Sequence, residues 1–287
     1  MKKRINKTNS KNLVKHEKAT IIGGEKKLQF IDVRELWEFR ELLWSLVVRD
    51  IKVRYKQTII GGLWAILQPF VTMVIFSIFF GLILKVPTNG VPYPVFSYSG
   101  LILWTYFTGS VASASGSLVA SGSLITKVYF PKIIIPLAAA ITGLIDYLIS
   151  GIVLIFLLLY FNMVPPATII FLPFIALLTT LLASGIGFWL SAINVKYRDV
   201  GYVIPFFIQS LLFLTPVIYP ISISPRFRNI LLMNPMTGII EAHRSMIIGT
   251  TPIVWSSLLL SIFISIIIFI SGAMYFKSVE KYFADII

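Results

Sequence analysis

Six long apolar segments dominate the chain after residue 60, each near the roughly 20 residues that a helix needs to cross a bilayer. They run approximately through residues 62–84, 95–117, 133–161, 167–193, 200–218 and 253–276. A lone apolar segment in lipid must satisfy its backbone hydrogen-bonding groups internally, so each segment is predicted to be helical. The pattern therefore predicts an all-α integral membrane protein whose transmembrane domain, residues 61–276, contains six transmembrane helices.

A different pattern precedes these segments, within residues 31–60. Apolar residues recur there at helical spacing, while basic residues occupy mainly the other side. The apolar positions are Leu36, Phe39, Leu43, Leu46, Val47 and Ile51. A helix of this kind lies in the headgroup plane rather than crossing the bilayer, so we predict an N-terminal amphipathic interfacial helix. A soluble core helix is the alternative. Residues 1–30, rich in Lys, Asn and Thr, are predicted to form a basic, flexible cytosolic tail.

The connection between the fifth and sixth segments is unusual, because Tyr219 to Thr250 is largely apolar yet interrupted by proline and glycine. A solvated loop would be more polar, so we predict short external re-entrant helices that dip back into the membrane. Glu241 and Arg244 are three residues apart and could pair on one helical face. Together with His243 they are candidates for bracing an external gate, and the alternative is a purely structural ion pair.

Composition narrows the function. Hydrophobic residues make up 57% and charged residues 13% of the 287 residues, against about 25% charged in soluble domains, which excludes a soluble enzyme. Cysteine is absent and histidine occurs twice, so disulfides, iron–sulfur clusters and multi-histidine metal sites are excluded and no metal site is predicted. The net charge of +13 is concentrated near the N-terminus, which favours anionic lipid headgroups over nucleic acid as its partner.

The distribution of Lys and Arg predicts the orientation. With the N-terminus inside, four of the 25 basic residues fall on the outside, namely Lys85, Arg226, Arg228 and Arg244. The prediction is a multi-pass protein of the cytoplasmic (inner) membrane with both termini cytosolic, residues 277–287 forming the C-terminus.

Chemistry-bearing residues are few. The chain has no G-x-x-x-x-G-K-[ST] motif, so we predict no catalytic site and no ATPase site in it. Asp146 is the one ionisable residue near the middle of a predicted span, and such residues are usually functional. A single carboxylate favours a buried helix–helix hydrogen bond over a proton relay.

Aromatic residues of the first, second and fifth segments are candidates for lining a conduit, because aromatic faces stack on sugar rings. Interfacial belts or lipid-facing surface are the default for each of them. The candidates are Trp64, Phe70, Trp104, Phe107, Phe206 and Phe213.

Four motifs in order carry a family resemblance. RDIKVRYKQTIIGGLWAILQPF (residues 49–70) resembles the approach to the first membrane helix of ABC-2 type polysaccharide export permeases. SLITKVYFPKIIIP (residues 123–136) is similar to the first cytosolic loop of that family, and NVKYRDV (residues 194–200) to the second. NPMTGIIEAHRSMIIG (residues 234–249) is similar to its external re-entrant segment. The resemblance covers about residues 35–280.

This resemblance implies the transmembrane subunit of an ABC exporter. It implies a homodimer with two copies of a cytosolic ATPase subunit, which would bind ATP and Mg, this chain itself holding no cofactor. The implied substrate is a polysaccharide of O-antigen, teichoic acid or capsule type on a polyprenyl-diphosphate lipid. The implied ATPase contacts are Arg49, Asp50, Arg54, Tyr55, Lys127, Tyr129, Phe130 and Lys132.

Charge suggests a role for the basic rim of the interfacial helix, where Lys52, Arg54 and Lys56 could attract the substrate diphosphate. Ordinary positive-inside topology is the alternative for each of them. The rival functions are an ABC-2 exporter of a drug or simple lipid and a proton-coupled flippase that requires Asp146. A membrane enzyme acting on lipid-linked sugars is disfavoured, because no paired carboxylates lie at a membrane face.

Overall fold

The structure is a computed structural model that describes residues 33–56, 61–197, 199–223 and 225–283. Every regular element within these ranges is helical, and no strand occurs in them. The predicted N-terminal tail lies outside the described residues. The α-helices are α1 (Val33–Glu38), α2 (Arg40–Lys56), α3 (Leu63–Phe76), α4 (Tyr93–Ala120), α5 (Gly122–Lys127), α6 (Ile134–Tyr160), α7 (Leu172–Lys196), α8 (Val200–Leu214), α9 (Arg228–Leu232), α10 (Pro235–Ile248) and α11 (Trp255–Val279). The other helical elements are the π-helix η1 (Ser77–Ile83) and the 3₁₀-helices η2 (Ala167–Phe171), η3 (Ile221–Ile223), η4 (Pro225–Phe227) and η5 (Glu280–Tyr282).

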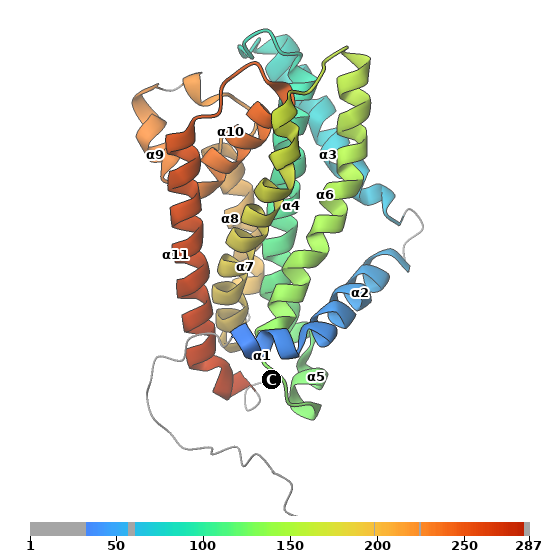
Figure 1. Cartoon of the computed structure of the whole chain (residues 1–287), viewed down its shortest axis with the longest axis vertical. Helices are drawn as coiled ribbons and strands as arrows, with labels where there is room; N and C mark the ends of the chain where they lie inside the picture. Colours follow the sequence, from blue (N-terminus) through green and yellow to red (C-terminus); the bar gives the residue numbers. More distant parts are fainter. Residues whose placement is uncertain (1–32, 57–60, 198, 224, 284–287) are drawn as a thin grey trace, which may run out of the picture.

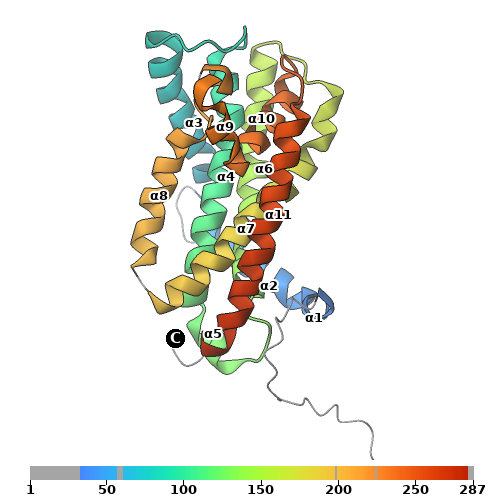
Figure 2. The ribbon, with the colours of Figure 1, turned by 90° about the vertical axis from the view of Figure 1, so that its left-hand side faces the viewer.

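The long helices run alternately up and down in one bundle (Figures 1 and 2). One end of the bundle, the α5 end, carries α5 and the end of α11; the other, the α10 end, carries α9 and α10. Within the described residues, four helical stretches are long and apolar enough to cross a membrane: Leu63–Ile83, Ile134–Tyr160, Ala167–Lys196 and Trp255–Tyr282. The molecule is therefore an all-helical, multi-pass membrane protein, as its hydrophobic pattern predicts.

Helix α4 lies at the centre of the bundle, in contact with α3, α6, α7, α8 and α10. It has 28 residues and no charged side chain, but serine, threonine, glycine and tyrosine are mixed with its apolar residues, so its mean hydropathy falls below that of the four spanning candidates. Its neighbours are helices, and two of its hydroxyls donate to carbonyls of α6: Ser110 to Ala140 at 3.0 Å and Tyr98 to Ser150 at 3.1 Å. A central position explains the polar composition.

Small residues bring helices α7 and α11 into backbone contact. A Cβ at Gly185 of α7 would lie 2.6 Å from Phe269 Cα, and a Cβ at Gly272 of α11 would lie 3.0 Å from Trp189 Cδ1. Helix α10 approaches α11 in the same way, since a Cβ at Gly238 would lie 2.6 Å from the Ser257 carbonyl oxygen. Close backbone approach at small residues is how membrane helices gain packing energy, so these glycines fix the spacing of one side of the bundle.

The predicted interfacial helix forms two helices, α1 and α2, separated by a turn at Phe39. Helix α2 packs against α6 through the buried side chains of Leu46 and Val47. Trp37 and Trp44 instead project from the protein, with 70% and 66% of their surfaces exposed. The α1–α2 segment thus lies on the outside of the bundle toward the α5 end (Figure 1).

Candidate functional site

Asp146 joins three helices. Its carboxylate accepts hydrogen bonds from the guanidinium of Arg54 and the hydroxyl of Tyr55, both at the end of α2. Arg54 also donates to Ser113 of α4 at 3.1 Å. The predicted helix–helix hydrogen bond of Asp146 is therefore confirmed, although the carboxylate is partly rather than fully buried. Arg54, a candidate for both ATPase and headgroup contact, has its charge engaged by this carboxylate.

Substituting Asp146 with asparagine should destabilise the protein by about 1–3 kcal/mol, because Arg54 loses its counter-charge at a partly desolvated site. Thermal unfolding of the purified protein measures the effect. Asp50→Asn is the matched control, since Asp50 pairs with its exposed neighbour Arg49. Equal stability of the two variants would contradict a structural role for the Arg54–Asp146 pair.

Four residues at the end of α5 and in the loop before α6 are predicted to contact an ATPase, and they differ in exposure. Tyr129 is 89% exposed and Lys127 is also exposed, whereas Phe130 is 4% exposed and packs in the core. Lys132 is held by Glu280 of η5: its amide donates to Glu280 Oε1 at 2.7 Å, and its ammonium donates to the Glu280 carbonyl at 3.2 Å. Only the tip of the loop is presented to the outside.

The candidate residues on α2 also differ, since some are exposed and others are bound to neighbouring side chains. Lys52 and Lys56 are exposed, while Arg49 donates to the neighbouring Asp50 carboxylate at 2.9 Å. Tyr55 is half-buried beside Asp146. The structure thus presents Lys52 and Lys56 together on an open basic surface.

The six candidate aromatics occupy two different environments. Trp104 and Phe107 are buried inside the bundle, with their rings 5.8 Å apart. The other four project outward from α3 and α8, two helices on the same side of the bundle (Figure 2). Their exposed fractions are 54% for Trp64, 39% for Phe70, 69% for Phe206 and 58% for Phe213. The six candidates therefore do not form one set, since two are buried in the bundle and four are exposed on α3 and α8.

Local sequence signals mark both ends of helix α10. Asn234 caps the N-terminus by accepting a hydrogen bond from the Met236 amide at 3.0 Å, and Pro235 occupies the first turn. Gly249 ends the helix in the left-handed conformation, with φ of 73°. Nearly the whole helix is buried, which places it inside the α10 end of the bundle.

Arg244 is fully enclosed and bonded to backbone. Its Nε donates to the carbonyl of Phe96 at 3.2 Å, its Nη1 to that of Pro216 at 2.7 Å, and its Nη2 to that of Val217. The guanidinium carbon also lies 3.9 Å from the centroid of the Phe96 ring. No Glu241–Arg244 ion pair forms within the described residues, so the predicted pairing is wrong. The carbonyls of Phe96 on α4 and of Pro216 and Val217 after α8 bind the guanidinium instead.

His243 is completely buried beside this network. Its Nε2 lies 2.9 Å from the hydroxyl of Tyr147 on α6. The residue therefore links α10 to α6 rather than facing outward, which the sequence does not indicate.

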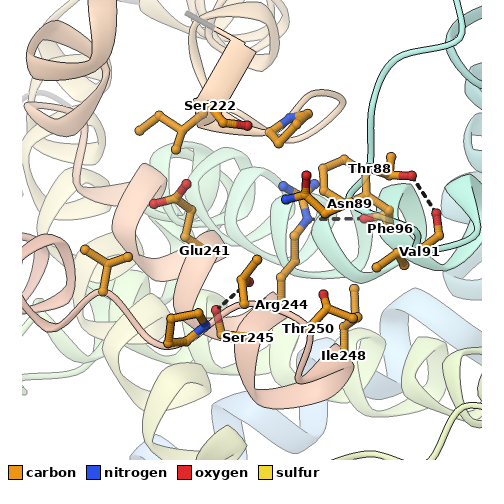
Figure 3. Close-up of a pocket in the computed structure, with 15 residues that line it drawn as sticks. Thr88, Asn89, Val91, Phe96, Ser222, Glu241, Arg244, Ser245, Ile248 and Thr250 are labelled. Carbon is orange, nitrogen blue, oxygen red and sulfur yellow. Dashed lines mark hydrogen bonds between the residues drawn. The ribbon is translucent and has the colours of Figure 1, made fainter. Parts of the chain in front are cut away.

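A cavity of about 180 Å³ opens at the α10 end, between α10, the loop before α4, the loop after α8 and the loop before α11 (Figure 3). Glu241 and Arg244 extend into it from α10. Burial raises the pKa of the Glu241 carboxyl, and the nearby charges of Arg244 and Arg228 oppose that rise. Among the described residues, no three His, Cys, Asp or Glu side chains lie close enough to hold a metal ion.

The sequence is similar to those of known transport proteins. Residues 41–248 match the protein family described as ABC-2 type transporter. The O-antigen export system permease protein RfbA of Myxococcus xanthus is 29% identical over 74% of this chain and 82% of its own length. The protein of the same name from Klebsiella pneumoniae is 28% identical over 86% of this chain and 95% of its own. The polysialic acid transport protein KpsM of Escherichia coli is 28% identical over 70% and 78%.

Proposed function

Because this chain belongs to the ABC-2 type transporter family, we propose that it is the permease subunit of an exporter that moves lipid-linked polysaccharide across the cytoplasmic membrane. The observation that carries the proposal is the similarity of this chain, over 70% to 86% of its length, to O-antigen export permease proteins and to a polysialic acid transport protein. Polymers of the O-antigen, teichoic acid or capsule type on a polyprenyl-diphosphate lipid are the proposed cargo.

The proposed topology has six spans, formed by α3 with η1, α4, α6, η2 with α7, α8, and α11. The four apolar candidate spans support it, as does the absence of charge from α4. The α5 end then faces the cytosol together with both termini, α1 and α2 lie along the membrane interface, and α9 and α10 are the re-entrant helices. The interfacial placement is supported by the exposed Trp37 and Trp44.

The proposed assembly is a homodimer with two copies of a cytosolic ATPase subunit, which binds ATP and Mg and drives transport. The lack of a P-loop motif in this chain supports an external ATPase. The exposed aromatic residues of α3 and α8 support pairing of two permeases around a conduit. Lys52 and Lys56 are suited to attracting the substrate diphosphate.

Purification of the tagged chain from native membranes in mild detergent tests the class. We expect a stoichiometric partner with a P-loop, and ATPase activity that depends on this chain. Lipid-linked polymer should accumulate inside a deletion strain. A chain that purifies alone and still transports after ATP depletion would overturn the proposal. If the deletion strain instead fails to export a drug or a simple lipid, that compound is the cargo and the polysaccharide is not.

Tyr129→Ala should weaken binding of the ATPase by about 30-fold, because an exposed aromatic knob at a proposed interface is typical of residues that contribute 2 kcal/mol or more. Recovery of the partner in the same purification measures it. Tyr160→Ala is the matched control, since Tyr160 is 78% exposed at the end of α6 remote from α5. If both variants retain the partner equally, Tyr129 is not a docking residue.

A proton-coupled flippase fits the structure less well. Such a transporter would need Asp146 to take up and release protons during transport. The carboxylate instead accepts hydrogen bonds from Arg54 and Tyr55. These two bonds hold the Asp146 side chain between α6 and the end of α2, which supports a structural role.

A further inference from the structure

The cavity at the α10 end combines a buried floor with an exposed polar rim. Its floor includes the side chains of Val91, Phe96 and Ile248, all buried. Its rim includes Asn89, Ser222, Thr250 and Thr251, all exposed. Figure 3 shows Ser222 and Thr250 on opposite sides of Glu241 and Arg244. The cavity therefore opens outward and offers amide and hydroxyl groups around its mouth.

Glu241 is the one carboxylate among the described residues that line this cavity. Its carboxylate is partly buried, and no hydrogen bond to it occurs among the described residues. Desolvating a carboxylate without a donor is costly, so a site that keeps one in this position is suited to a ligand that donates hydrogen bonds. Hydroxyl groups supply such donors without adding charge.

The charge of the cavity argues against an ionic ligand. Arg244 uses three of its five N–H donors on backbone carbonyls, and Glu241 would repel an anion such as phosphate. The buried guanidinium equally disfavours a cation, and a divalent ion requires several oxygen ligands where the described residues supply one carboxylate. A neutral, hydroxyl-rich molecule matches both the balance of charge and the rim.

We propose that this cavity binds one pyranose unit of the exported polymer as the polymer leaves the bundle, with Glu241 accepting hydrogen bonds from neighbouring sugar hydroxyls. The volume of about 180 Å³ suits a single sugar ring rather than an oligosaccharide. This inference rests on the proposed function, which places the α10 end outside the membrane. In this inference Glu241 binds a ligand. The earlier hypothesis that Glu241 braces an external gate would require only contacts within the protein.

Saturation-transfer NMR on the intact transporter complex in lipid nanodiscs tests the site. The probes are the methyl pyranosides of glucose, mannose, galactose and N-acetylglucosamine, with phosphoethanolamine and glycerol phosphate as lipid-headgroup analogues. We expect at least one pyranoside to bind, and Glu241→Gln to weaken it about ten-fold, because a charged acceptor is replaced by a neutral one. Glu38→Gln, at an exposed position on α1, should bind as the unchanged protein does.

Three results would overturn the inference: no signal from any pyranoside, an equal signal after Glu241→Gln, or a signal from the headgroup analogues alone. Should Glu241→Gln fail to fold, Thr250→Val at the exposed rim replaces it, with a several-fold loss expected. Polymer export in the deletion strain is scored separately. If the complex exports polymer but binds no pyranoside, the sugar site is refuted and the proposed function stands. If a pyranoside binds but the deletion strain exports polymer normally, the proposed function is refuted.

Discussion

Arg244→Met should destabilise the protein by at least about 3 kcal/mol, the largest effect that we expect from a single side chain. The substitution keeps much of the side-chain length but removes the guanidinium donor from the carbonyl oxygens of Pro216 and Val217, while the Phe96 carbonyl keeps the Ser99 hydroxyl as a donor at 2.9 Å. Each buried, unsatisfied carbonyl costs about 1–3 kcal/mol. These carbonyls belong to α4 and to the segment after α8, so the loss should loosen α10 from both.

Size-exclusion chromatography after heating measures this effect, as the temperature at which half of the monodisperse peak is lost. Arg226→Met is the control, because Arg226 lies in η4 and is exposed. Arg244→Lys should be intermediate, since one ammonium group cannot reach three divergent acceptors as the guanidinium fork does. A melting temperature for Arg244→Met that matches the control would show that the carbonyls find other donors.

Gly185→Ala should be almost as damaging, by about 1–3 kcal/mol, although it adds only a methyl group. The new Cβ would lie 2.6 Å from Phe269 Cα and 2.7 Å from Phe269 N, and backbone atoms of a helix cannot rotate away. Helices α7 and α11 would have to separate along their contact. The same heating assay measures the loss.

Gly151→Ala in α6 provides the matched control, because a Cβ at that position meets nothing within 4 Å. Alanine also favours a helix over glycine by roughly 1 kcal/mol, so this variant should be neutral or slightly stabilising. Opposite signs for the two substitutions would identify packing, rather than helix propensity, as the cause. If Gly185→Ala is also neutral, the α7–α11 contact is more adaptable than its geometry indicates.

The all-helical fold and the presence of spanning helices could be predicted from the sequence, because segment length and apolar composition respond directly to the thickness of the bilayer. Helix α10 could be predicted too, since Asn234-Pro235 and Gly249 are local signals for its two ends. Both kinds of information lie within a short window of sequence. The central position of α4 could not be predicted, because its mixed polar composition is also typical of a marginally apolar spanning helix that faces lipid.

The contacts of the candidate residues could not be predicted. Arg54 and Asp146 are 92 positions apart, and their pairing depends on how α2 crosses α6. The pairing of Glu241 with Arg244 was wrong because spacing along one helix says nothing about backbone acceptors from other helices. Those acceptors carry no side-chain signal, although the glycine at position 100 leaves the space that the Arg244 guanidinium occupies.

The long helices of the bundle differ in stiffness because only some of them contain an internal proline. Helix α11 runs for 25 residues, about 37 Å, with no proline, and Glu280 ties its end to the loop that carries Tyr129. Helices α3 and α8 each contain an internal proline, Pro69 and Pro205, and so each lacks a backbone hydrogen bond. Under a load applied at the loop, α11 should behave as a strut that displaces as a whole, while bending concentrates in the two compliant helices.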